Sequence, residues 1–188
     1  DAKSIDDFIF GRLQQLDIRP AAPCPDEVFV RRVHIDMLGT VPKADEAAAF
    51  LADRKQDKRK RLIDQLLKRE EFADYWSMKW GDLLLIKAEF PINLWPNAAQ
   101  SYHRWVRNAL VQNKPYDQMA REMLTASGSN FRVGQVNFYR AMQNRTPDGI
   151  ARTVALTFMG TRAEKWSTEK LELFAACFAE VGYKPTRE

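Results

Sequence analysis

Residues Asp26–Leu51, DEVFVRRVHIDMLGTVPKADEAAAFL, carry the pattern that most limits how this chain can fold. Phe29 and Val33 begin an apolar series with a spacing of four, which predicts an amphipathic helix. Gly39 fits the left-handed position that ends a helix, and Pro42 prevents the helix from continuing. The stretch therefore predicts a helix, a firm stop and a second short helix from about residue 44 to residue 52.

Charged residues interrupt the apolar series of the first helix. Arg32 and Asp36 are four residues apart, so their side chains share a face, and Arg31 lies next to them. Buried charges survive mainly when they are paired. We therefore expect Arg31, Arg32 and Asp36 to pair at the edge of a core or inside it, and to hold the centre of the fold.

Other segments repeat the helical pattern, and none shows a clear series of alternating strands. Helical patterns cover residues 4–16, 53–70, 71–88, 97–112, 115–124, 147–160 and 168–182, whereas residues 136–143 fit a strand or a helix equally well. The prediction is an all-α fold, a compact single-domain bundle of seven to nine helices with irregular proline-rich loops. The domain would span residues 1–188, with a soft division near residues 127–137.

The composition excludes several classes of protein. With 188 residues, 45% of them hydrophobic, the chain can build a real core and is not disordered. A net charge of +4 is too small to indicate a dedicated nucleic-acid binder. No apolar run approaches the length of a membrane span. Because the chain begins at Asp1, we expect a fragment or a processed product.

The two cysteines, Cys24 and Cys177, stand near opposite ends of the sequence. A bridge between them would close most of the chain into one loop and would stabilise the fold. The sequence gives no sign that they are close together, so two separate thiols are the favoured interpretation.

Six strings in order carry a family resemblance: IDDFIFGRL, RRVHIDMLGTVP, YWSMKWGDLL, YHRWVRNALVQNKPYDQM, VNFYR and ARTVALTFMGTR. Together they resemble a domain-of-unknown-function family, of the PSCyt type, found in large secreted, cytochrome-associated proteins of planctomycetes and verrucomicrobia. The resemblance covers nearly the whole chain. It implies an exported protein, at the cell surface or in the periplasm, and it implies no established reaction.

One feature of many members of that family is missing here. Their chains continue, after the segment that resembles FMGTR, into a Cys-x-x-Cys-His string for covalent haem. Such attachment needs both thiols and the histidine. This chain has only Ala163, Glu164 and Lys165 between Arg162 and Trp166. We therefore predict no covalent haem and no other cofactor.

Two carboxylates are candidates for catalysis. Asp36 and Asp82 both stand in apolar helical stretches. If they were buried and met in space, one could stay protonated while the other was charged, as acid proteases and glycosidases require. The alternative is that each carboxylate is paired with a nearby cation or indole and is structural. No serine triad and no phosphate-binding glycine loop accompanies them.

Aromatic residues supply the candidates for binding. Trp95 lies in the proline-bounded segment EFPINLWPN, and Tyr102, His103 and Trp105 follow it closely. Together they could form a flat platform for sugar rings or for a partner protein. Packing in the core is the alternative for all of them except Trp95.

A basic run offers a third kind of site, for nucleic acid or another polyanion. It comprises Arg54, Lys58, Arg59, Lys60 and Arg61, but neighbouring aspartates and the lack of interleaved aromatics favour a solvated helix start.

The chain has only two histidines, His34 and His103. That is too few for an ordinary zinc or iron centre, so we predict no metal site.

These patterns favour a non-catalytic binding or scaffolding domain of an exported protein. Its partner would be a glycan or glycoprotein, or a neighbouring domain of a larger protein, and the domain would be a monomer. The first alternative is a hydrolase that uses Asp36 and Asp82. The second is weak polyanion binding through residues 54–61.

Overall fold

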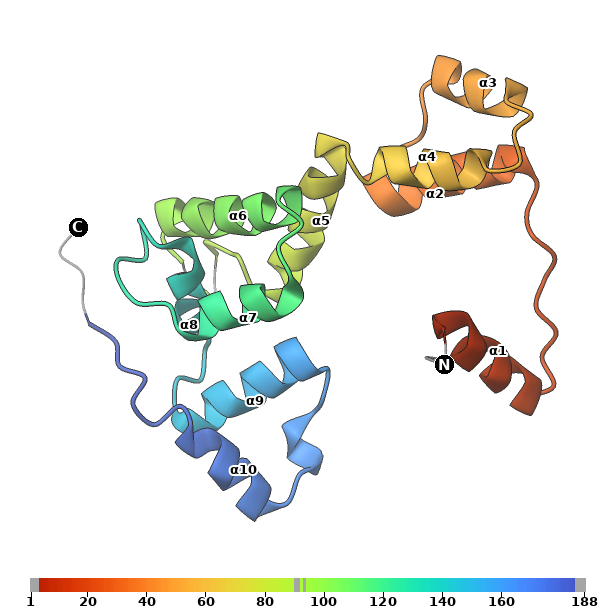
Figure 1. Cartoon of the computed structure of the whole chain (residues 1–188). Helices are drawn as coiled ribbons and strands as arrows, with labels where there is room; N and C mark the ends of the chain where they lie inside the picture. Colours follow the sequence, from red (N-terminus) through yellow and green to blue (C-terminus); the bar gives the residue numbers. More distant parts are fainter. Residues whose placement is uncertain (1–3, 90–91, 93, 185–188) are drawn as a thin grey trace. The chain divides into compact units, whose positions relative to one another are not determined.

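The computed structural model describes residues 4–89, 92 and 94–184. All regular structure in this part of the chain is helical, which confirms the all-α prediction. There are ten α-helices there, against the seven to nine expected, because residues 137–141, which fitted a strand or a helix equally well, form a short helix. The helices are α1 (Ile5–Gln15), α2 (Asp26–Leu38), α3 (Ala44–Ala52), α4 (Lys58–Leu66), α5 (Glu70–Leu83), α6 (Pro96–Val111), α7 (Tyr116–Leu124), α8 (Asn137–Ala141), α9 (Pro147–Met159) and α10 (Thr168–Ala176), with 3-10 helices at Gly134–Val136 and Ala163–Lys165 (Figure 1).

Contacts within the chain group it into two units, residues 1–63 and residues 64–188. The segment near residues 127–137, where the sequence indicated a soft division, lies within the second unit.

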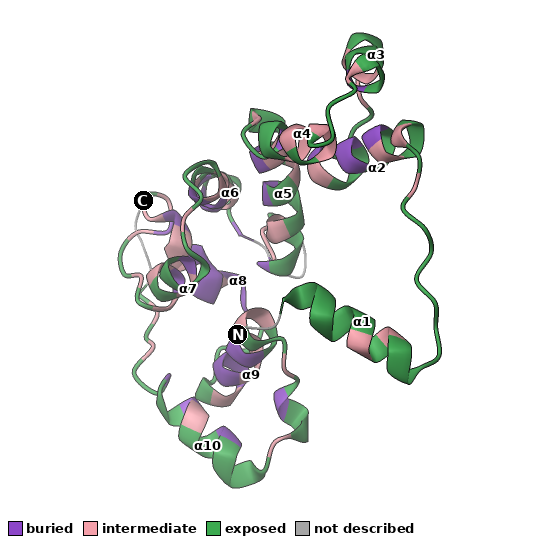
Figure 2. Cartoon of the chain, turned by 45° about the vertical axis from the view of Figure 1, so that its right-hand side comes forward, coloured by how far each residue is buried: buried purple, intermediate pink, exposed green. Residues whose placement is uncertain are grey.

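The first unit begins with a helix that has no buried residue. Ser4 caps α1 through the reciprocal pair of hydrogen bonds with Asp7, as the sequence predicts. Most of the apolar side chains of α1 are nevertheless exposed, and Figure 2 shows no buried residue along the helix.

The stretch that most limits the fold forms as expected. Gly39 ends α2 with φ of 71°, the left-handed conformation that glycine adopts at least cost. α2 and α3 then pack through Phe29 and Phe50, whose rings stack with centroids 5.8 Å apart. His34 is buried on α2, where its Nδ1 lies 2.8 Å from the carbonyl oxygen of Val30.

Asp26 is the first residue of α2. It makes no capping bond, because its carboxylate binds Lys58 at 2.6 Å and Arg59 at 2.7 Å on α4. Lys58 also lies over the ring of Phe50, and Arg59 over the ring of Phe29. Asp26, two cations and two aromatic rings thus hold α2, α3 and α4 together.

The second unit has a larger core. Buried apolar residues from α6 to α10 and from the segment after α5 form one cluster: Leu84, Ile92, Leu94, Tyr102, Val106, Ala109, Met119, Met123, Phe138, Tyr139, Ala141, Met142, Ile150, Ala151, Val154, Ala155, Ala163, Leu171, Ala175 and Phe178. α6 is central to this unit, because α5 and the 3-10 turn at Gly134 both pack on it. A Cβ at Gly134 would lie 2.5 Å from the Ser101 carbonyl oxygen, so only glycine allows that approach.

Candidate functional site

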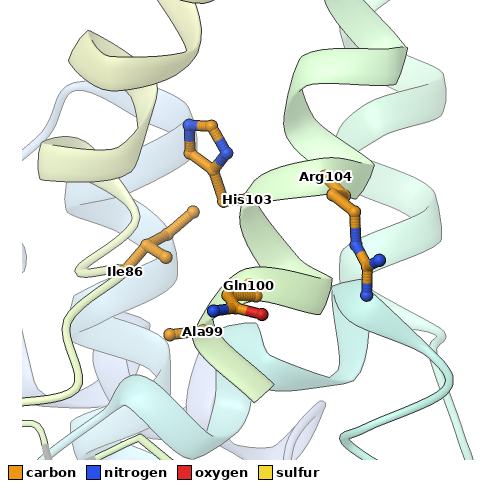
Figure 3. A pocket seen from close by; sticks show the side chains of 5 residues that line it. All are labelled: Ile86, Ala99, Gln100, His103 and Arg104. Atoms are coloured by element: carbon orange, nitrogen blue, oxygen red, sulfur yellow. The ribbon is translucent and has the colours of Figure 1, made fainter. Parts of the chain in front are cut away.

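A pocket of about 450 Å³ lies on the outer side of α6, within the second unit. Ala99, Gln100, His103 and Arg104 line it from α6, and Ile86 lines it from the segment after α5. Figure 3 shows the His103 ring above Ile86, whereas the Arg104 side chain extends to the other side of α6. The pocket therefore combines a small apolar floor with an imidazole, an amide and a guanidinium.

The spacing of residues along α6 groups the pocket side chains of this helix into two neighbouring faces. Ala99 and His103 are four residues apart, as are Gln100 and Arg104, so each pair lies on one face of the helix. The residues that α6 turns into the core come between them in sequence, and Tyr102 is fully buried there. Packing of the inner face thus presents the pocket residues outward.

Ile86 owes its place to the way α5 ends. The amide of Ile86 donates to the Gly81 carbonyl at 2.8 Å, and the amide of Leu85 donates to Asp82 at 3.3 Å. These are the paired bonds of a Schellman ending, which normally has glycine in its left-handed position. Here Leu85 adopts φ of 57°, a conformation that costs a side-chain-bearing residue about 1 kcal/mol. The strained turn directs Ile86 toward α6.

A buried serine holds the ring of His103. Ser77 on α5 donates its hydroxyl proton to the Asp74 carbonyl at 2.9 Å, and its Oγ lies 3.3 Å from His103 Nε2. Because that proton is committed, Ser77 Oγ accepts from His103, which places the histidine proton on Nε2. Nδ1 of neutral His103 is then left as a hydrogen-bond acceptor for the pocket.

The same geometry argues against a serine nucleophile. Ser77 is fully buried, and it gives its proton to a backbone carbonyl rather than to His103. A catalytic serine needs the opposite arrangement, in which histidine accepts the hydroxyl proton and the oxygen is reachable.

The described lining of the pocket contains no carboxylate to neutralise its cation. Arg104 makes no ion pair with any described residue. Arg107, one turn farther along α6, differs because it donates to Asp74 at 2.5 Å and lies 3.8 Å from Glu70. The hydrogen bond to Asp74 raises the pKa of Arg107. The cationic charge of Arg104 is thus available to a ligand, whereas that of Arg107 is already balanced.

Trp95 stands at the end of α6 nearest to Ala99. It is the residue before Pro96, which begins the helix, and its carbonyl accepts from the Ala99 amide at 2.9 Å. Its side chain is 71% exposed, the highest value among the aromatic side chains that the structure describes. Trp95 and the pocket therefore follow one another along α6, separated by one helical turn.

Two of the four predicted platform residues are not available for stacking. Tyr102 is wholly buried and its hydroxyl donates to the Met123 sulfur, so the prediction that it binds ligand is wrong. Burial also raises the pKa of the Tyr102 hydroxyl. Trp105 is half-buried, donates from its indole to Glu122 at 3.2 Å and carries Lys114 over its ring. The aromatic spacing could not distinguish the inner face of α6 from its outer face.

The two candidate catalytic carboxylates are both exposed, and they belong to different units. The acid–base hypothesis required burial, because burial would have kept one of the two carboxyl groups protonated. The exposure of Asp36 and Asp82 removes that condition. The helices that carry them are apolar on one side only, and each aspartate lies on the other side.

The expected internal ion pair on α2 is also wrong. Arg31, Arg32 and Asp36 are all exposed, and no salt bridge between described residues joins them. The buried positions of α2 are Val30, Val33, His34 and Leu38, which leaves the arginines on the solvent side.

Much of the basic run is already paired within the first unit. Lys58 and Arg59 bind Asp26, and Arg61 binds Asp53 at 2.5 Å and Asp57 at 3.1 Å. The remaining predicted residues, Arg54 and Lys60, are exposed. Only part of the run could therefore offer uncompensated charge to a polyanion.

Cys24 and Cys177 are both free thiols, as the sequence analysis favoured. In the part of the chain that the structure describes, no three histidine, cysteine or acidic side chains gather as a metal site would require. No helix in that part combines the length and the apolar character needed to cross a bilayer.

Ser77, Ile86, Gln100 and Arg104 were not predicted as site residues. The spacing of four between Gln100 and Arg104 and between Ala99 and His103 was a usable signal. Nothing in the sequence indicated that Ile86 and Ser77 would meet α6, because those contacts are made between different helices.

Residues 4–178 match the family described as PSCyt2, protein of unknown function (DUF1549). The chain belongs to this family. The match to PSCyt2 confirms the resemblance found in the sequence and covers most of both units. No curated protein and no solved structure matches the chain.

Proposed function

We propose that this PSCyt2 chain is a non-catalytic glycan-binding domain and that its binding surface is the outer side of α6, from Trp95 to Arg104. The observation that carries the proposal is the neighbouring position of an exposed tryptophan and a polar pocket on one helix. The apolar faces of sugar rings stack on aromatic side chains, and ligand sites combine such surfaces with a few polar groups that fix orientation.

The polar groups of the pocket suit hydroxyl-rich ligands. Gln100 can donate and accept, Arg104 donates, and neutral His103 accepts through Nδ1 while Ser77 holds its Nε2. Sugar hydroxyl groups both donate and accept, so this mixture supports a glycan over a purely apolar ligand. The expectation that the domain acts in an exported, cell-surface or periplasmic protein rests on the resemblance of its sequence.

The test is a calorimetric titration of the purified chain with neutral trisaccharides and with the acidic trisaccharides triglucuronate, trimannuronate and trigalacturonate. We expect at least one of them to bind, with affinity reduced at least tenfold in Trp95→Ala and largely kept in Trp95→Phe, which retains a stacking ring. Leu173→Ala removes a comparably exposed apolar side chain from α10 and serves as the matched control.

Two results would contradict glycan binding on α6. One is that no trisaccharide binds the folded wild-type chain. The other is that Trp95→Ala and Leu173→Ala bind the same ligand as well as wild type does. Binding of a protein partner that Trp95→Ala alone abolishes would keep the surface but replace its ligand class.

A further inference from the structure

The charges on the outer side of α6 indicate the charge of the ligand, which Trp95 alone does not. Arg104 makes no ion pair with a described residue, and the described pocket lining holds no carboxylate. Arg107, three residues farther along α6, is held by Asp74 and Glu70. The helix thus keeps one guanidinium neutralised and leaves the one in the pocket without a counter-charge.

We propose, as a refinement that rests on the proposed glycan-binding function, that the ligand is an acidic oligosaccharide whose sugar carboxylate binds Arg104. A guanidinium presents a planar fork of N–H groups that matches the two oxygens of a carboxylate. Gln100 lies one turn before Arg104 on the same face, and its amide can donate to the same carboxylate or to a ring hydroxyl.

The length of the surface sets the smallest ligand that can use all of it. Trp95 and Arg104 are separated by nine residues, or about two and a half turns, which places Arg104 roughly half a turn around the helix from Trp95 and roughly 13 Å farther along its axis. This distance exceeds the width of a single sugar ring. A ligand that stacks on Trp95 and pairs with Arg104 therefore contains at least two sugar units and curves around α6, with the acidic unit toward Arg104.

The experiment compares triglucuronate, trimannuronate and trigalacturonate, each with its own methyl ester, which keeps the shape of the sugar and removes the charge. We expect at least one acid to bind about tenfold more tightly than its ester at low salt, the scale of one exposed charge-assisted hydrogen bond. The preference should shrink as salt is added. The monosaccharide of the same acid should bind much more weakly than the trisaccharide.

Arg104→Gln should lose the preference for the acid while it still binds the ester. Arg121→Gln makes the same charge change at an exposed position on α7, outside the pocket lining, and should leave the preference intact. Equal binding of every acid and its ester, or an equal loss of preference in both variants, overturns the acidic ligand but leaves glycan binding standing. Failure of every acidic and neutral trisaccharide to bind overturns both proposals.

Discussion

The two units of this chain are stabilised in different ways. In the second unit, α6 buries Tyr102 and Val106 completely within an extensive apolar cluster. In the first unit, few side chains are buried, and Asp26 instead ties α4 to α2 through Lys58 and Arg59, which also cover aromatic rings. Apolar packing thus dominates one unit, and partly exposed charge contacts are prominent in the other.

This difference indicates where a binding surface can be built. A site needs side chains held in fixed positions by packing beneath them, as the inner face of α6 holds its outer face. Exposed ion pairs contribute little to stability and are screened by salt. We therefore expect the second unit to be the more stable of the two and to keep its binding surface when the first unit is weakened.

The largest effect is expected from Tyr102→Ala. Removing a fully buried aromatic side chain costs roughly 3–5 kcal/mol, because it loses apolar burial and leaves a cavity. Tyr102→Phe, which removes only the bond to the Met123 sulfur, should cost less than about 1.5 kcal/mol. Urea denaturation followed by circular dichroism measures both. A small cost for Tyr102→Ala would mean that the centre of the second unit is poorly packed.

Phe50→Ala should have the next largest effect, and it should be confined to the first unit. Phe50 is buried, stacks on Phe29 and lies under Lys58, so its loss should cost about 3 kcal/mol. Hydrogen exchange should show faster exchange in α2 and α3 and unchanged exchange in α6. Equal acceleration in both units would show that they unfold as one, contrary to the proposed difference.

Acid should weaken the first unit before the second. Hydrogen bonds from Lys58 and Arg59 lower the pKa of Asp26, and a backbone bond from Lys55, followed by one from Arg61, lowers the pKa of Asp53. A carboxyl group whose folded pKa is lowered adds stability above its unfolded pKa of about 4, and this stability is lost as the pH falls through the folded pKa.

Hydrogen exchange in α2 between about pH 5 and pH 3 measures this loss. In Asp26→Asn the charge is already absent, so the first unit should be weaker at neutral pH and should change less as acid is added. Asp36→Asn is the matched control, since Asp36 is exposed on the same helix and makes no described ion pair. The same acid response in wild type and in Asp26→Asn would contradict the role given to Asp26.

The smallest effect is expected from Asp36→Ala and Asp82→Ala. Substitution of an exposed side chain outside any network usually changes stability by no more than about 0.5 kcal/mol. Thermal denaturation measures this, and mass spectrometry of the trisaccharides after incubation should recover them intact with wild type and both variants. Cleavage by wild type that is lost in both folded variants would revive the hydrolase alternative.

The helical fold could be predicted from the sequence because its signals are local. Gly39, the capping pair of Ser4 and Asp7, and the apolar series of α2 and α6 each act within a turn or two. The extra short helix at residues 137–141 lacked such signals, since a segment of that length fits a strand as well.

The site could be predicted only in part. Trp95 and His103 were found because a proline-bounded aromatic and a rare histidine are conspicuous in sequence. Tyr102 was misplaced, because hydrophobicity does not say which side of an aromatic helix faces the core. Arg31 and Asp36 were wrongly expected to be internal for a related reason. The sequence does not show that α2 is buried on one side only.

Ligand binding on α6 can be tested by nuclear magnetic resonance spectra of the labelled chain, recorded while each acidic trisaccharide is added. We predict that the largest shifts occur at the Trp95 indole N–H and the Gln100 side-chain amide, with the backbone amides of residues 99–104 next and those of residues 54–61 unmoved. Shifts concentrated in residues 54–61, or no shift along α6 with any of the three acids, would contradict the claim that α6 carries the binding surface.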